Sequence, residues 1–256
     1  MKIGISTACF YPETTERALD RIAALGVDQA EIFVNSPSES TPAAARRFRK
    51  QAQKAGIRLV AFHPFTSFAE SYCLFSSYER RRQDFYEIYR RYFAAAAQAG
   101  CRVFHFHGAL ADTSMPVARY CEIYSHLFAL AQKEGVLFSQ ENVWNFLSGR
   151  AAFLLEMHRL LGNEVCFTLD IKQAMRRGED PLAIREAMGD RIVHLHLNDW
   201  TASGSCALPG QGCSPYKKLL DTGLRGDEIT KVVEVYRSDF SADFDLLSAI
   251  QSMNNF

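Results

Sequence analysis

The sequence has no apolar run long enough to cross a membrane, since none approaches the roughly 20 residues that a spanning helix needs. It also has no excess of charge of either sign, because 29 lysines and arginines balance 29 aspartates and glutamates. This balance gives no global electrostatic reason to bind nucleic acid or a membrane surface. We therefore expect neither as a partner. The sequence leaves open whether the protein forms a homo-oligomer.

Cysteine is present but follows no pairing pattern. The seven cysteines are scattered, and no two of them form a C-x-x-C pair. This distribution argues against a disulfide framework and against a structural zinc ribbon. Residues 1–10 also lack the basic segment and the small-residue cleavage site of an export signal. We expect a protein of the reducing cytoplasm.

Glycine, in contrast, recurs at a regular place in the pattern. Seven times a helical stretch runs to a glycine, and a short β-branched or aromatic run follows. A helix C-terminus favours glycine because this residue tolerates the left-handed backbone conformation. The glycines are Gly26, Gly56, Gly100, Gly135, Gly162, Gly189 and Gly223, and the runs lie at 30–34, 58–62, 102–106, 136–140, 165–169, 191–197 and 231–235.

With the run at 2–6 these segments make eight predicted strands, and strands that alternate with helices form a parallel sheet with right-handed crossovers. The predicted helices lie at 15–26, 42–56, 78–100, 116–135, 149–162, 180–189, 214–223 and 244–253. An open doubly wound sheet would need a glycine-rich phosphate turn after its first strand, and residues 6–12 contain none. The pattern predicts an α/β fold, a single (β/α)8 TIM barrel with residues 1–256 as one domain.

Ionisable side chains stand at the ends of the later strands, where such a barrel carries its chemistry. Four consecutive strand ends carry Glu141, Asp170, His196 and Glu234. Carboxylates that meet in one pocket repel one another unless a cation offsets them. Three carboxylates and one imidazole suit Mn2+, Mg2+ or Co2+, and they also admit Zn2+. We predict that these four residues bind one divalent metal ion.

Five short segments carry a resemblance to a known family. They are QENVW (140–144), TLDIKQA (168–174), HLHLND (194–199), LPGQG (208–212) and VEVY (233–236), and they appear in the family's order. Together they resemble the xylose isomerase-like TIM barrel superfamily, specifically its sugar phosphate isomerases and epimerases, to which apurinic endonuclease family 2 is related. The resemblance covers essentially the whole chain.

The resemblance implies a function in carbohydrate metabolism. In the ketose epimerases of this superfamily, the residues that match the four predicted ligands hold one metal ion. The two residues of those epimerases that match Glu141 and Glu234 also act as acid and base on opposite faces of the substrate. A metal ion on the carbonyl and hydroxyl oxygens stabilises a cis-enediolate while a carboxylate moves the proton. The resemblance therefore implies an isomerase or epimerase of a sugar or sugar phosphate, with manganese among the suitable ions.

Three positions depart from those epimerases. Gln173 stands where histidine is frequent, and Ala202 and Leu147 stand where an arginine and a glutamate are expected. Gln173 can hydrogen-bond a hydroxyl group but cannot carry a proton. The identity of the sugar is therefore not implied.

Three further functions compete with this one. The apurinic-site endonucleases of this superfamily use three zinc ions, and His63 and His107 match ligand positions in them. Here Gln173 replaces a further histidine and the loop 205–208 lacks the Asp-x-His pair of those enzymes. The neutral net charge also gives no excess of basic residues to bind a phosphate backbone, so the sequence argues against an endonuclease. A metal-dependent keto-polyol dehydratase would use the same enolate chemistry but expel a hydroxyl group. A non-catalytic carbohydrate-binding barrel is the third possibility.

The remaining candidates surround the predicted pocket. We expect His63, His107, Gln173, Trp144 and Arg237 to bind substrate, with Trp144 and Phe10 as stacking walls. A long loop after the third strand, with the aromatics Phe65, Phe68, Tyr72 and Phe75, is expected to form either a lid, which we favour, or a subunit contact. The turn 208–212 is either a phosphate cradle or a structural turn.

Overall fold

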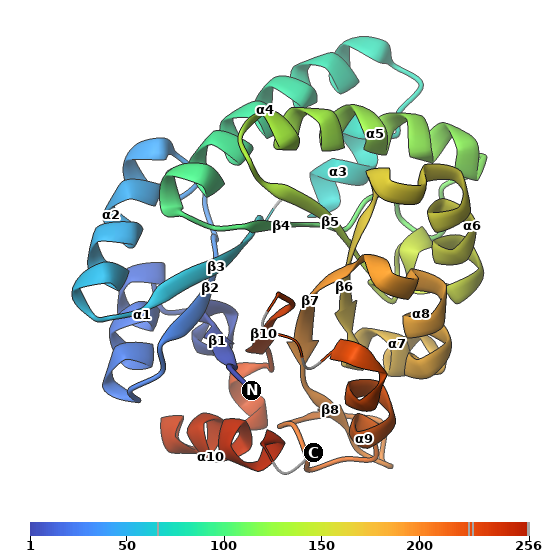
Figure 1. Cartoon of the computed structure of the whole chain (residues 1–256). Helices are drawn as coiled ribbons and strands as arrows, with labels where there is room; N and C mark the ends of the chain where they lie inside the picture. The colour runs from blue at the N-terminus through green and yellow to red at the C-terminus, as the bar shows by residue number, and fades with distance from the viewer. Residues whose placement is uncertain (66, 225, 227, 255–256) are drawn as a thin grey trace.

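Eight parallel strands form a closed barrel in the computed structural model, which describes residues 1–65, 67–224, 226 and 228–254. The strand order around the barrel is β1-β10-β7-β6-β5-β4-β3-β2, and the helices pack around the outside (Figure 1). The strands are β1 (Gly4–Ser6), β2 (Gln29–Phe33), β3 (Arg58–His63), β4 (Val103–Phe106), β5 (Leu137–Glu141), β6 (Cys166–Asp170), β7 (Ile192–Leu197) and β10 (Thr230–Val233). The predicted (β/α)8 TIM barrel is confirmed.

The helices follow the predicted pattern, with ends that differ by a few residues. They are α1 (Thr15–Ala24), α2 (Pro42–Lys54), α4 (Glu79–Ala99), α5 (Val117–Lys133), α6 (Ala151–Leu161), α8 (Pro181–Met188), α9 (Tyr216–Leu219) and α10 (Asp243–Met253). Helix α9 is shorter than predicted because the chain continues as a π-helical turn over Leu220–Leu224. None of the helices described is long and apolar enough to span a membrane.

Two helices were not predicted. Helix α3 (Ser67–Leu74) lies in the segment after β3 that the sequence suggested as a long loop, and α7 (Ile171–Arg177) begins directly after β6. Asp170 caps α7, because its side chain accepts a hydrogen bond from the backbone N–H of Gln173. The start of α7 is therefore tied to a predicted metal ligand.

All seven glycines that the pattern placed at helix ends have positive φ angles. Gly100 shows the reason: it ends α4 at φ 80° and ψ 18°, a left-handed conformation that is costly for a residue with a Cβ atom.

The barrel interior changes character along its axis. One group of its buried side chains is apolar and consists of Val60, Ala61, Val103 and Val232. Further along, the register pairs Thr168 with His194 and Asp170 with His196 on neighbouring strands. Barrel interiors of this kind are usually packed with branched apolar side chains, so a polar layer here indicates a functional end.

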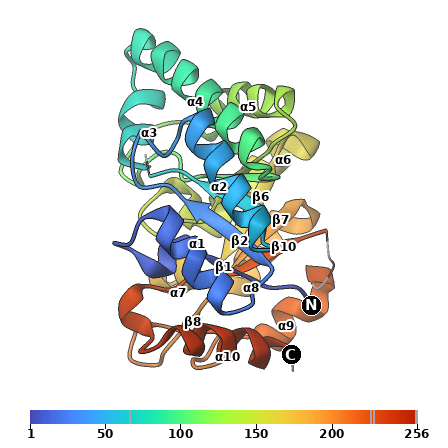
Figure 2. The same ribbon diagram turned by 90° about the vertical axis from the view of Figure 1, so that its left-hand side faces the viewer.

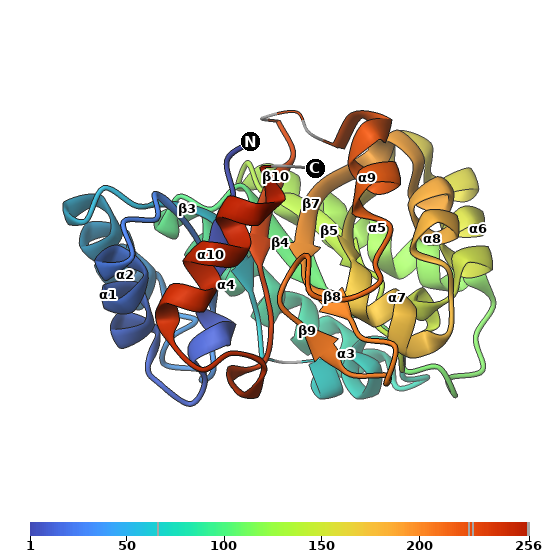
Figure 3. The ribbon, with the colours of Figure 1, turned by 90° about the horizontal axis from the view of Figure 1, so that it is seen from below.

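The functional end lies opposite the N-terminus. Figure 3 shows the N-terminus at one end of the barrel, with α3 and a two-stranded ribbon, β8 (Asp199–Trp200) and β9 (Cys206–Ala207), at the other. On the flank, α1 and α2 lie side by side (Figure 2). The end that carries α3 and the ribbon is the one at which the strands finish.

Candidate metal centre and active-site cavity

Glu141, Asp170, His196 and Glu234 converge at the C-terminal end of the barrel. Glu141 and Asp170 are the last residues of β5 and β6, His196 lies in β7, and Glu234 follows β10 directly. One potential ligand atom from each of the four lies within 4.8 Å of the others. The structure thus brings together the four side chains that the sequence singled out.

The spacing of these atoms fits a shared cation. Nδ1 of His196 lies 3.1 Å from Oε1 of Glu141, 3.3 Å from Oε2 of Glu234 and 3.5 Å from Oδ2 of Asp170. One ring nitrogen can donate only one hydrogen, so hydrogen bonding alone does not account for three oxygens around it. Ligand atoms about 2.1 Å from one ion lie about 3.0 to 3.4 Å apart in octahedral or tetrahedral geometry. The observed spacing therefore suits one divalent ion.

Two asparagines fix the orientation of Asp170. Asn198 donates a hydrogen bond from Nδ2 to Oδ1 of Asp170 (3.1 Å). Asn142 bonds the main chain of Asp170 on both sides, since its Nδ2 donates to the carbonyl and its Oδ1 accepts from the N–H, each at 2.8 Å. These contacts leave Oδ2 of Asp170 directed at His196 and Lys172.

Lys172 is a site residue that the sequence analysis missed. Its Nζ donates hydrogen bonds to Oδ2 of Asp170 and Oε2 of Glu234, both at 2.7 Å. Burial alone would lower the pKa of Lys172, but Asp170 and Glu234 raise it well above its ordinary value. Lys172 is therefore an ammonium at neutral pH, and it shares two oxygens with any ion bound at His196.

Glu141 is bound on both of its oxygens. Oε1 faces His196, whereas Oε2 lies 2.9 Å from Nε2 of His107 and 3.3 Å from Nε2 of His63. Burial alone would raise the pKa of Glu141, but His196, His107 and His63 together hold it well below the ordinary range. Burial alone would lower the pKa of His107, but Glu141 raises it above its ordinary value. Glu141 is therefore an anion whose outer oxygen is covered by two imidazoles.

Helix α3 positions His107 through a buried carboxylate. Oε2 of Glu70 accepts hydrogen bonds from the backbone N–H groups of His107 (3.1 Å) and Gly108 (2.9 Å). Oε1 of Glu70 accepts a further hydrogen bond from the hydroxyl of Tyr89 at 2.6 Å. Glu70 is only 1% exposed, so these donors supply the hydrogen bonds that water would otherwise provide.

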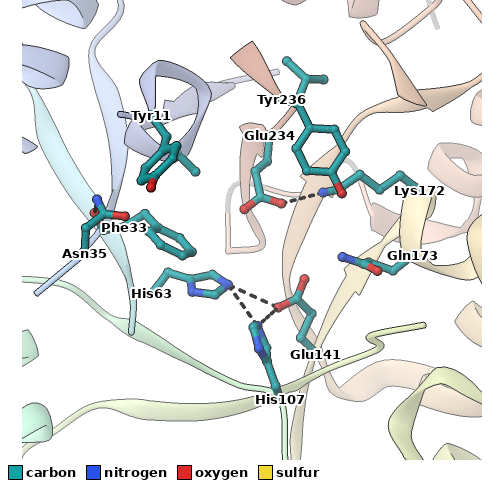
Figure 4. Close-up of a pocket in the computed structure, with 12 residues that line it drawn as sticks. Tyr11, Phe33, Asn35, His63, His107, Glu141, Lys172, Gln173, Glu234 and Tyr236 are labelled. Carbon is teal, nitrogen blue, oxygen red and sulfur yellow. Dashed lines mark hydrogen bonds and ion pairs between the residues drawn. The ribbon is translucent and has the colours of Figure 1, made fainter. Parts of the chain in front are cut away.

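A cavity of about 350 Å³ lies over these groups (Figure 4). Its base is formed by His63, His107, Glu141, Lys172, Gln173 and Glu234, and its other walls by Ala8, Tyr11, Phe33, Asn35, Val235 and Tyr236. In Figure 4 Lys172 and Tyr236 stand beside Glu234, while Phe33 and Asn35 come from the opposite side. A polar base with partly aromatic walls has the size and character of a small-molecule site.

Three of the five predicted substrate-binding residues, His63, His107 and Gln173, line this cavity, but Trp144 and Arg237 are not part of its described wall. The Trp144 ring packs against Arg176, and the backbone N–H of Trp144 donates to Oε1 of Gln173. The Arg237 guanidinium packs on Phe240 and donates to the carbonyl of Phe240. Both side chains are therefore engaged elsewhere.

The suggested stacking wall at Phe10 and the loop predicted after β3 need correction. Phe10 is fully buried in the core against Phe240, so it offers no stacking surface to a substrate. The expected lid segment contains helix α3 in place of a loop; its Phe68 and Tyr72 are 78% and 62% exposed, and Phe75 is buried. No aromatic side chain of this segment belongs to the cavity wall described above.

The turn 208–212 serves a structural role. Oδ2 of Asp199 accepts hydrogen bonds from the backbone N–H groups of Gly210 (3.0 Å) and Gly212 (2.8 Å), and Oδ1 accepts one from Ser214 (2.9 Å). Because an internal carboxylate already occupies these donors, the turn does not cradle a phosphate group. Asp199 follows the strand that carries His196, so the turn fixes the chain next to the candidate metal centre.

Comparison with known proteins places the chain in a family. Residues 19–246 match the family model of the xylose isomerase-like TIM barrel, and the chain belongs to that family. An uncharacterized protein of Mycobacterium tuberculosis (strain ATCC 25618 / H37Rv) is 26% identical over 261 residues, which cover 91% of this chain and 89% of the relative.

Solved structures share the fold. One is a D-tagatose 3-epimerase-like protein with 18% identity and a TM-score of 0.79. The match covers 100% of this chain and 97% of that protein. The D-psicose 3-epimerase of Clostridium cellulolyticum H10, solved with D-tagatose, has 20% identity and a TM-score of 0.77. This match covers 100% of this chain and 99% of the epimerase. A probable 3-DHS dehydratase of Bacillus anthracis has 12% identity and a TM-score of 0.74, and the match covers 100% of this chain and 99% of the dehydratase. The resemblance inferred from the sequence is confirmed at the level of family and fold.

Proposed function

We propose that the protein is a divalent-metal-dependent isomerase or epimerase of a sugar or sugar phosphate. The observation that carries this proposal is the convergence of three carboxylate oxygens on Nδ1 of His196 at the base of a small-molecule cavity. Structures of sugar epimerases with the same fold support the substrate class. Glu141, Asp170, His196 and Glu234 would hold the ion, and Mn2+, Mg2+ or Co2+ suits a set of three oxygens and one nitrogen.

The two glutamates are not equivalent as proton-transfer groups. A bound ion would polarise the substrate carbonyl and stabilise the negative charge that develops when the neighbouring carbon loses its proton. Oε1 of Glu234 accepts no hydrogen bond from the residues that the structure describes, whereas both oxygens of Glu141 are engaged. Glu234 is therefore assigned as the base that removes the proton.

This asymmetry bears on the type of reaction. A single base that returns the proton to the adjacent carbon, while a second proton passes between the two substrate oxygens, performs an isomerisation, so Glu234 suffices for the transfer between the carbons. Epimerisation needs a second acid on the opposite face, so His107 and His63 would have to release Oε2 of Glu141 when substrate binds. Lys172, which binds Oε2 of Glu234, holds this carboxylate in place and can donate to a substrate oxygen in the cavity.

Solvent exchange tests the proposal. The protein loaded with Mn2+ is incubated in D2O with D-psicose, D-fructose and D-tagatose, and with their phosphate esters, and deuterium beside the carbonyl is measured by mass spectrometry after removal of the ion. We expect incorporation with at least one ketose, and a loss of about 10² to 10⁴-fold in Glu234→Gln, the usual contribution of a general base. An aldose product indicates isomerisation and an epimeric ketose indicates epimerisation.

Two outcomes would overturn the proposed function. The first is no deuterium incorporation into any ketose by Mn2+-loaded protein, which would leave a binding protein. The second is loss of water from the substrate with an enone or diketone absorbance, which would identify a dehydratase. Trp144→Phe serves as the matched control, because its ring lies outside the cavity wall and its exchange rate should equal that of the unchanged protein.

A further inference from the structure

Below the metal centre, three imidazoles surround a single buried carboxylate. Oε2 of Glu31 lies 2.7 Å from Nε2 of His105, 3.1 Å from Nε2 of His196 and 3.3 Å from Nε2 of His194. Oε1 of Glu31 accepts a hydrogen bond from the hydroxyl of Ser6 at 2.8 Å. All five side chains are 0% exposed, so none of these groups exchanges its partner for solvent.

The positions of the protons follow from the partners. A carboxylate oxygen only accepts hydrogen bonds, so the Nε2 atoms of His105 and His196, which bond Oε2 of Glu31, must carry their hydrogens. In a neutral ring Nδ1 is then an acceptor, and hydroxyl groups meet it in two of the three rings. The hydroxyl of Thr168 lies 2.9 Å from Nδ1 of His105, and that of Thr230 lies 2.6 Å from Nδ1 of His194.

His196 differs from the other two rings at Nδ1. No hydroxyl among the described residues meets this atom; it faces the oxygens of Glu141, Glu234 and Asp170 instead. A hydrogen held on Nε2 leaves the Nδ1 lone pair as the one that points at the metal centre. The contact between Glu31 and His196 thus selects which nitrogen of the ring is a ligand.

We propose that Glu31 is a positioning residue, which holds the proton of His196 on Nε2 and so presents Nδ1 to the metal ion. The inference rests on the proposed function in so far as His196 binds that ion. His105 and His194 complete the arrangement, because their rings pack on His196 and share the same carboxylate oxygen. A Glu31 that only filled space in the barrel would have no preference for one nitrogen of His196.

Metal binding and histidine NMR together test the role of Glu31. Mn2+ is titrated calorimetrically into the unchanged protein, Glu31→Gln and Ser6→Ala, and the unfolding midpoint of each protein in EDTA reports its stability. Loss of a carboxylate that orients a metal-bound histidine costs about 10- to 100-fold in affinity, and we expect this loss for Glu31→Gln. Ser6→Ala is the matched control: it removes the partner of Oε1 and the cap on the backbone N–H of Ala8, but it leaves the contacts of Oε2 with the imidazoles, so its Mn2+ affinity should be unchanged.

The second readout follows the proton itself. In 15N-histidine-labelled protein, loaded with Mg2+ to avoid paramagnetic broadening, we expect Nε2 of His196 to carry the hydrogen and Nδ1 to carry none. In Glu31→Gln we expect this single form to give way to a mixture, because an amide can donate as well as accept. Should Glu31→Gln fail to fold, the NMR of the unchanged protein still decides, since a hydrogen on Nδ1 and none on Nε2 overturns the inference.

Other results also overturn it. Equal Mn2+ affinity of Glu31→Gln and the unchanged protein would reduce Glu31 to a structural group, as would equal losses in Ser6→Ala and Glu31→Gln. Two Mn2+ ions per chain, one of which is lost in Glu31→Gln, would make Glu31 and its imidazoles a metal site. These failures differ from failure of the proposed function, which is tight Mn2+ binding without exchange on any ketose.

Discussion

Nζ of Lys172 donates a hydrogen bond of 2.7 Å to Oε2 of Glu234, the same oxygen that lies 3.3 Å from Nδ1 of His196. An ammonium and a metal ion would therefore draw on one carboxylate oxygen. Each such oxygen has two lone pairs, so both can be accommodated, but their positive charges repel one another.

The charge of Lys172 should oppose metal binding while it stabilises the metal-free protein. Replacing Lys172 with methionine keeps most of the length of the side chain but removes the ammonium that bonds Asp170 and Glu234. Breaking a buried ion pair costs about 3 to 5 kcal/mol, so unfolding by urea in EDTA should show a loss of this size. Mn2+ affinity should rise by at least about tenfold, because the nearby charge no longer repels the ion.

Lys172→Arg controls for charge, since it keeps the cation and should bind Mn2+ no more tightly than the unchanged protein. Calorimetric titration of the three proteins measures the difference. A Lys172→Met protein with weakened Mn2+ affinity would mean that Lys172 supports the metal centre and does not compete with the ion.

The stability of the metal-free protein should fall as the pH rises above neutral. Burial alone would lower the pKa of His196, but Glu234, Glu31 and Glu141 raise it well above its ordinary value. A group whose pKa is raised on folding contributes stability that is complete below its unfolded pKa, about 6.5, and is lost as the pH rises through the folded value. Melting temperatures in EDTA should therefore decline from pH 7 upward.

A bound ion should abolish this dependence, because it takes the place of the proton on Nδ1 of His196. Melting curves of Mn2+-loaded and EDTA-treated protein over the same pH series provide the comparison. Parallel curves for the two forms would show that the ion and the His196 proton do not compete.

Glu70 should contribute to stability through its three hydrogen-bond donors. Glu70→Gln removes the charge that the N–H groups of His107 and Gly108 bond, and hydrogen bonds to charged groups contribute about 1.5 to 3 kcal/mol. Tyr89→Phe removes one of the three donors to this carboxylate, so it should cost about 1.5 kcal/mol, the low end of that range. Urea unfolding of both variants measures the two losses; a larger loss for Tyr89→Phe than for Glu70→Gln contradicts the assignment.

Gly108 follows His107 and cannot accept a side chain. Its φ is 90°, and a Cβ atom would lie 1.9 Å from the hydroxyl oxygen of Tyr120. Gly26 has a φ of 71° but open space around its Cβ position, so Gly26→Ala carries the backbone strain alone, about 1 kcal/mol or more. Gly108→Ala adds the displacement of Tyr120 and should be destabilised further in urea unfolding. Equal losses in the two variants would show that Tyr120 moves aside freely.

The barrel could be predicted from the sequence because its periodic signals are local. A glycine such as Gly100 ends a helix, and an apolar run such as 102–106 follows, wherever the unit lies in the chain. Helix α3 escaped prediction because its apolar residues do not share one face: Phe68 and Tyr72 are exposed while Leu74 is buried. Its position depends on Glu70 and the chain after β4, a contact between distant segments.

The candidate site was predictable in part for the same reason. Strand ends in a barrel converge, so Glu141 and Asp170 could be placed together from their positions alone. Lys172 lies two residues after Asp170, in a segment for which the sequence predicted neither helix nor strand. Only the first turn of α7 brings its amino group back to Glu234. The role proposed for Glu31 depends on three imidazoles from β4 and β7, a juxtaposition that no local pattern reveals.

The central claim is that Glu141, Asp170, His196 and Glu234 hold one divalent ion. Calorimetric titration of the metal-free protein with Mn2+, beside Asp170→Asn and His196→Ala, tests it most directly. The claim predicts one ion per chain, bound at least about 100-fold more weakly in both variants because each loses a ligand. Unchanged protein that takes up no Mn2+, or variants that bind as tightly as it does, would contradict the claim.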